Sequence, residues 1–82
     1  MEGNNLTMKA SSLKEGQSGR IQEIDLPKDT KLRMLELGLR KGMVVTVIRR
    51  FGKDFMLKVI GPNPIAVSKE ILDGISIVSS SV

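Results

Sequence analysis

Leucines recur at helical spacing in the middle of the chain and predict one short helix. Leu32, Leu35 and Leu39 fall three to seven residues apart, with charged residues between them. We expect the helix to run from Asp29, whose side chain accepts hydrogen bonds from the first free amides, to Gly38, which supplies the positive φ that ends a helix. The three leucines would then form the stripe that faces the core.

The rest of the chain alternates apolar and polar residues, a pattern typical of β-strands. Ile21 and Ile24 mark the inward side of a first strand at residues 19–24, and Val45 and Val47 mark the inward side of a later one. Further elements are expected at residues 12–15 (a capped helical turn anchored by Leu13), 51–55 (a polar loop), 55–59, 65–67 and 75–77 (strands), 61–64 (a turn) and 69–72 (a helical turn).

These elements favour a mainly β fold, namely a small SH3-like β-barrel of about five strands with one short inserted helix. Closure into a barrel would remove the exposed strand edges through which sheets associate. The 82 residues suffice for one domain. We expect the barrel to span residues 8–78, between a flexible N-terminal leader at 1–7 and a frayed C-terminal tail at 79–82. The oligomeric state stays open.

The composition excludes most catalytic and metal-binding chemistry. The chain has no cysteine and no histidine, which removes thiolate nucleophiles, imidazole bases and the usual ligands of transition metals. Its carboxylates are scattered, and no glycine-rich phosphate loop is present. We therefore expect no enzyme activity, no catalytic residue, no cofactor and no metal site. A binding or regulatory module remains.

The chain lacks the features of a secreted or membrane-spanning protein. No apolar stretch approaches the ~20 residues that a spanning helix needs. Met1 is followed by polar and acidic residues, where a secretory signal needs basic and then apolar ones. We expect a cytoplasmic protein that associates with a membrane only through a partner.

Several segments resemble the FeoA family, the small ferrous iron transport protein A. The residues LRMLELGLRKG at 32–42, followed by Val45, Thr46 and Val47, resemble its helix-to-strand signature. Residues 13–21 resemble its opening, and residues 64–67 and 75–77 its closing strands. The resemblance implies an SH3-like barrel with an inserted helix. It also implies a non-catalytic accessory that binds the cytoplasmic GTPase region of an FeoB-type Fe(II) permease, although the same domain type also ends metal-dependent transcription regulators.

The residues of this signature divide into structural and partner-binding candidates. Gly38 and Gly42 have backbone roles, as a helix stop and a turn before the next strand. The residues expected to build the structural support are Leu35, Gly38, Leu39, Gly42, Val45 and Val47. The residues expected to touch the permease are Met34, Leu37, Arg40, Lys41 and Arg33.

Met34 is the first of these partner-binding candidates. On a helical wheel it falls off the leucine stripe, so we expect its side chain to be partly exposed, and a flexible thioether suits a shallow partner surface. Arg33 and Leu37 flank it. The alternative is that Leu39 folds back over Met34 beyond the end of the helix, in a Schellman-type contact.

The basic residues leave a second function open. Arg40, Lys41, Arg49, Arg50 and Lys53 form either a solvated face or a surface for an acidic partner or an anionic membrane leaflet. Residues 42–52 also resemble the KOW segment of nucleic-acid-binding barrels. A net charge of +4, only two phenylalanines and no tryptophan argue against nucleic acid, and against an SH3-type groove for proline-rich peptides.

Overall fold

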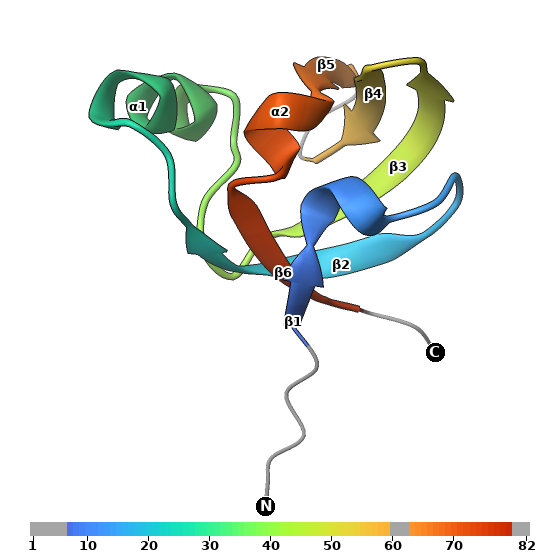
Figure 1. Cartoon of the computed structure of the whole chain (residues 1–82), viewed down its shortest axis with the longest axis horizontal. Coiled ribbons are helices and arrows are strands. Elements are labelled where there is room, and N and C mark those ends of the chain that lie inside the picture. The colour runs from blue at the N-terminus through green and yellow to red at the C-terminus, as the bar shows by residue number, and fades with distance from the viewer. Residues whose placement is uncertain (1–6, 60–62, 80–82) are drawn as a thin grey trace, which may run out of the picture.

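Six antiparallel strands form one sheet in the order β1-β6-β2-β3-β4-β5 (Figure 1). The computed structural model describes residues 7–59 and 63–79. The strands are β1 (Thr7–Lys9), β2 (Ser18–Ile24), β3 (Val44–Phe51), β4 (Asp54–Lys58), β5 (Ile65–Ser68) and β6 (Ile75–Ser79). Three helical segments complete the fold: the 3-10 helix η1 (Ala10–Ser12), α1 (Lys28–Glu36) and α2 (Lys69–Leu72).

The mainly β, SH3-like fold predicted from the sequence is confirmed, but the sheet does not close. Within the described ranges β1 and β5 are the two edges of the sheet, and no ladder joins them. The strand beyond the expected five is β1, in which Thr7 pairs with Val78. Near the C-terminal end of the chain, Ser79 of β6 pairs with Gly19 of β2. Strand pairing therefore extends one residue beyond each end of the predicted core at 8–78.

The core lies on the inner face of the sheet and follows the predicted alternation, except in β2, where a register shift between Ile21 and Glu23 interrupts it. Val45 and Val47 are buried, as are Ile21, Ile24 and Leu57. The remaining buried apolar side chains are Ala10, Leu13, Met34, Leu39, Phe55, Val67, Leu72, Ile75 and Ile77. The turn predicted at 61–64 falls partly outside the described residues.

The first helical turn lies earlier than the sequence predicts. It occupies Ala10–Ser12 rather than 12–15, and the Ser12 hydroxyl donates to the Lys9 carbonyl oxygen at 2.6 Å instead of capping a helix. Leu13 is buried, as expected of the anchor, and Gly16 has the expected positive φ of 87°. The Glu15 carboxylate accepts a hydrogen bond from the backbone N–H of Arg50 at 3.0 Å, so it fastens this turn to β3.

A β-bulge in β3 changes which side chains face the core near the end of the strand. Val47 pairs with Leu57 on the inner face, but the register then shifts at Ile48, so that Arg50 pairs with Phe55. The Arg50 guanidinium lies 4.7 Å from the centre of the Phe55 ring. Because β3 continues to Phe51, the loop predicted at 51–55 is reduced to residues 52–53.

A polar contact joins η1 to α2. The hydroxyl of Ser11, which is 7% exposed, donates to one carboxylate oxygen of Asp73, and Lys69 Nζ lies 3.4 Å from the other. The Ser11 hydrogen bond is the main reason that the pKa of Asp73 lies below its ordinary value. Lys69 and Lys9 lower this pKa further, and partial desolvation opposes them.

We expect Asp73→Asn to remove a pH-dependent contribution to stability. A carboxyl whose pKa is lowered by folding stabilises the fold above its ordinary pKa, and this contribution is lost as the pH falls through the lowered value. The melting temperatures of parent and variant should therefore differ at neutral pH and converge on acidification below the lowered pKa. Ser11→Ala should reproduce most of the difference. A gap that stays constant down to the most acidic pH measured would show that the carboxylate charge is not the cause.

Candidate functional site

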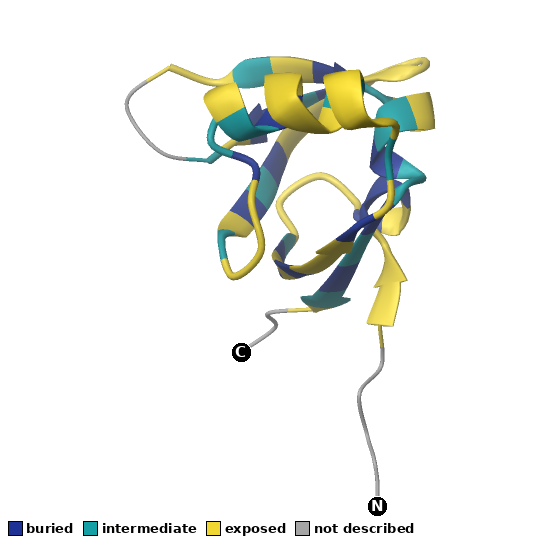
Figure 2. Cartoon of the chain, turned by 90° about the vertical axis from the view of Figure 1, so that its left-hand side faces the viewer, coloured by how far each residue is buried: buried dark blue, intermediate teal, exposed yellow. Residues whose placement is uncertain are grey.

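The helix α1 stands apart from the strands (Figure 1) and is the most exposed element of the predicted signature. Met34 is its one fully buried side chain. Figure 2 shows the helix from the side on which it projects, with mostly exposed residues toward the viewer. A helix of this kind is held to the core by a single anchor and leaves the rest of its surface free to contact another molecule.

The start of α1 differs from the prediction. Pro27 occupies the N-cap position and the helix begins at Lys28, so Asp29 lies within the first turn rather than ahead of it. The capping role predicted for Asp29 is therefore wrong. Its carboxylate still suits this place, because the N-terminus of a helix favours negative charge. The first backbone bond runs from the N–H of Lys31 to the Pro27 carbonyl oxygen, at 2.8 Å.

The end of α1 is a Schellman motif built on Gly38. This glycine has a φ of 97°, and its N–H donates to the Leu35 carbonyl oxygen at 3.0 Å. The N–H of Leu39 donates to the Met34 carbonyl oxygen at 2.9 Å. In such a motif the residue after the glycine packs back on the last turn. Leu39 and Met34 are 1% and 3% exposed and belong to one core cluster.

The prediction that Met34 is partly exposed is therefore wrong, and the alternative that Leu39 folds back toward it is confirmed. The face of α1 that points to the core therefore differs from the predicted leucine stripe. Leu35 is half-buried, whereas Leu32, which the sequence predicts to face the core, is 52% exposed. Sequence reasoning missed Leu32 because it counted Leu39 on the helix, although Leu39 lies beyond the stop at Gly38.

The other partner-binding candidates lie on the surface. Leu37 is 40% exposed, and Arg33, Arg40 and Lys41 are exposed as well. We call these four residues together with Leu32 the α1 surface. Lys41 Nζ lies 3.8 Å from Glu23 Oε1, but both side chains are more than two-thirds exposed, so this pair contributes little to stability.

A depression of about 170 Å³ lies beside the α1 surface, between α1 and α2. Met34 and Ile71 supply its apolar lining, and Asp29, Thr30 and Arg33 its polar one. It offers a place for one side chain of a docking protein, with a carboxylate and a guanidinium both available for polar contacts.

Among the predicted structural residues, Val45 and Val47 of β3 belong to the core, and Gly42 forms the turn before this strand. Val45 and Val47 are 1% and 0% exposed. Gly42 has a φ of 89°, and its N–H donates to the Ile21 carbonyl oxygen at 2.8 Å. The turn before β3 is thereby tied to β2, which holds the segment after α1 in place.

The basic residues that the sequence groups together separate in space. Arg40 and Lys41 follow α1, whereas Arg49, Arg50 and Lys53 lie on the β3–β4 hairpin, at the other end of the molecule in Figure 1. The group is therefore two surfaces rather than one.

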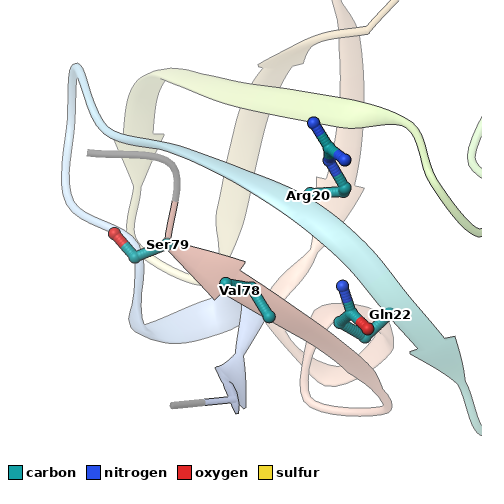
Figure 3. A pocket seen from close by; sticks show the side chains of 4 residues that line it. All are labelled: Arg20, Gln22, Val78 and Ser79. Atoms are coloured by element: carbon teal, nitrogen blue, oxygen red, sulfur yellow. The ribbon is translucent and has the colours of Figure 1, made fainter. Parts of the chain in front are cut away.

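The described residues hold no group of side chains that could bind a metal ion. Across residues 7–59 and 63–79 no three acidic side chains gather as a metal site, and no helix of this part is long and apolar enough to span a membrane. A depression of about 270 Å³ on β2 and β6 is lined by Arg20, Gln22, Val78 and Ser79 (Figure 3). It presents polar side chains without a carboxylate.

Comparison with known proteins gives the family. The family model of the FeoA domain matches residues 8–79. A crystal structure of an iron uptake regulatory protein, FeoA, is similar with a TM-score of 0.81 at 16% identity, over 90% of this chain and 99% of that one. The FeoA protein of Chlorobium tepidum gives a TM-score of 0.83 at 21% identity, over 90% and 71% of the two chains.

A manganese-dependent transcriptional repressor shares the fold as well, with a TM-score of 0.76 at 15% identity, over 94% of this chain but only 44% of the repressor. No match was found among curated proteins. The three structural similarities establish the fold alone, because their identities are low. The family model covers nearly the whole described chain, and the chain therefore belongs to the FeoA family.

Proposed function

We propose that this protein is a non-catalytic regulatory protein of ferrous iron uptake that acts from the cytoplasm by binding the GTPase region of an FeoB-type permease. Membership of the FeoA family indicates involvement in ferrous iron transport. The observation that carries the proposed contact is the α1 surface, in which a projecting helix keeps one anchor in the core and exposes Leu32 by 52%.

The α1 surface combines the two components of a protein-binding site. Leu32 and Leu37 are exposed apolar side chains, and complete burial of a leucine contributes about 1.5–3 kcal/mol. Arg33 on the same helix and Arg40 and Lys41 in the segment after it add positive charge, which favours an acidic partner and speeds encounter with it. The depression beside Arg33 and Met34 adds a pocket for one anchoring side chain of the partner.

The test is capture of the purified permease GTPase domain by this protein, with and without GTP. Leu32→Glu should weaken binding by roughly tenfold or more, because it places a charge where an apolar contact is required. The matched control is Phe51→Glu, because Phe51 is 51% exposed at the end of β3. The β3–β4 turn lies at the other end of the molecule from α1 (Figure 1), so this change should leave capture unchanged. Equal capture of the parent and the Leu32 variant would reject the α1 surface as the site of contact.

A further inference from the structure

The β3–β4 hairpin presents an exposed aromatic ring among cations. Phe51 is 51% exposed and lies next to the two-residue turn at 52–53. By register, Arg49 pairs with Met56 and Phe51 with Asp54 on the outer face of the hairpin. The Arg49 guanidinium lies 5.8 Å from the centre of the Phe51 ring. We call Arg49, Phe51, Lys53 and Lys58 the hairpin surface; Arg50 is not part of it, because it pairs with Phe55 on the inner face.

The bulge at Ile48 creates this arrangement. Uninterrupted alternation from Val45 and Val47 would turn Phe51 toward the core, whereas the register shift turns it outward and sets Arg50 against Phe55. Phe55 is 0% exposed and takes the inner position at this end of the core. Bulges commonly re-aim side chains next to functional sites. The exposure of Phe51 is thus built into the strand.

Most of the net charge of the chain resides on this hairpin. Residues 44–58 contain four cations and one anion, a balance of +3 within a chain of +4. Glu15 also lies against the hairpin, since its carboxylate accepts the hydrogen bond from the Arg50 N–H. Even with this carboxylate included, the hairpin region stays positive, which suits an extended anionic surface.

We propose that the hairpin surface binds an anionic lipid bilayer peripherally, with the Phe51 ring inserted among the headgroups and the surrounding cations close to lipid phosphates. Peripheral binding combines buried apolar area with attraction to anionic lipid and requires no spanning helix. Besides Phe51, the same strand exposes Ile48 by 43% at the bulge. This aliphatic side chain suits a lipid interface, whereas nucleic acid would call for several aromatic rings that stack on bases.

The position of the hairpin allows membrane contact and permease contact at the same time. In Figure 1 the β3–β4 turn and α1 lie at opposite ends of the longest axis of the molecule. The α1 surface therefore stays free when the hairpin faces a bilayer. The inference does not depend on the permease, because lipid binding is measured with the protein alone.

Insertion is tested with a tryptophan reporter, because the chain has no tryptophan or tyrosine of its own. The emission of Phe51→Trp should shift to the blue when vesicles of phosphatidylcholine and phosphatidylglycerol in equal parts are added, and not with phosphatidylcholine alone. Leu32→Trp is the matched control, since Leu32 is 52% exposed at the other end. An unshifted Phe51→Trp spectrum, or equal shifts at both positions, would overturn the proposal.

Cosedimentation with the same vesicles tests the cations. Arg49→Gln and Lys53→Gln should each weaken binding by roughly fivefold, and added salt should weaken it further. Lys28→Gln on α1 removes the same charge elsewhere and should have a smaller effect. Equal losses of vesicle binding for all three variants would mean that only the net charge matters, and would reject the hairpin surface as the site of lipid binding. Tighter binding of a single-stranded RNA oligonucleotide than of the vesicles would also overturn the proposal, in favour of nucleic acid.

Discussion

Replacing Met34 with alanine is expected to lower the free energy of unfolding by about 2–5 kcal/mol, the range for large-to-small changes in a core. Met34 is 3% exposed and is the one fully buried side chain of α1. Its removal leaves a cavity beneath the helix and takes away the anchor that holds α1. Urea denaturation followed by far-UV circular dichroism measures the change.

Leu32→Ala is the control for Met34→Ala, because it truncates a side chain of similar size on the same helix at an exposed position. Its free energy of unfolding should stay within about 0.5 kcal/mol of the parent. The two positions also separate core from contact surface: Leu32 variants should weaken capture of the permease domain at unchanged stability, whereas Met34→Ala should lower stability first. A Met34→Ala protein as stable as the parent would contradict the assignment of Met34 to the core.

Phe55→Ala should destabilise the protein by about 3–5 kcal/mol. The ring is 0% exposed, pairs across the sheet with Val67 and Arg50, and is the largest of the fully buried side chains in the described residues. Small domains have a total stability of about 5–15 kcal/mol, so this loss takes a large share of it. Thermal and urea unfolding monitored by circular dichroism should show a much lower midpoint, or an already unfolded chain.

Phe51→Ala is the matched control, since it removes the other phenylalanine four residues away in the same hairpin. Phe51 is half exposed and contacts the Arg49 guanidinium, a kind of interaction that contributes about 0.5–1 kcal/mol at exposed sites. The loss of stability should therefore stay at or below about 1 kcal/mol. Similar losses for the two alanine variants would mean that the bulge does not divide the phenylalanines between core and surface.

The strands were predictable because alternation is a local signal. Ile21, Val45, Val47 and Leu57 face the core, as their spacing indicates. Ile24 lies three residues after Ile21 and faces the core because the register of β2 shifts between Ile21 and Glu23. A residue in a strand that is covered on one face has only two directions available, so the apolar positions reveal the inner face without knowledge of the partner strand. Edge strand β1 was not predicted, because its three residues, Thr7–Lys9, are too few to show an alternation of apolar and polar positions.

The orientation of α1 was not predictable from spacing alone. The stripe of Leu32, Leu35 and Leu39 is a valid helical pattern, yet Met34 is the residue that enters the core. The sequence did contain the deciding signal, since Gly38 ends the helix and makes Leu39 fold back. Choosing between the two faces requires knowing where the core lies relative to the helix axis, which a nine-residue helix does not encode by itself.

By itself the sequence determined the mainly β fold, the absence of histidine and cysteine chemistry, and the place of the helix stop at Gly38. These follow from residue types and from interactions between near neighbours in the chain. Only the tertiary structure decided that β1 is a strand, that the sheet stays open, that Leu32 is outside and Met34 inside, and that the Ile48 bulge exposes Phe51. Each of these outcomes depends on which distant segments pack together, because burial is a property of the assembled core and not of the local chain.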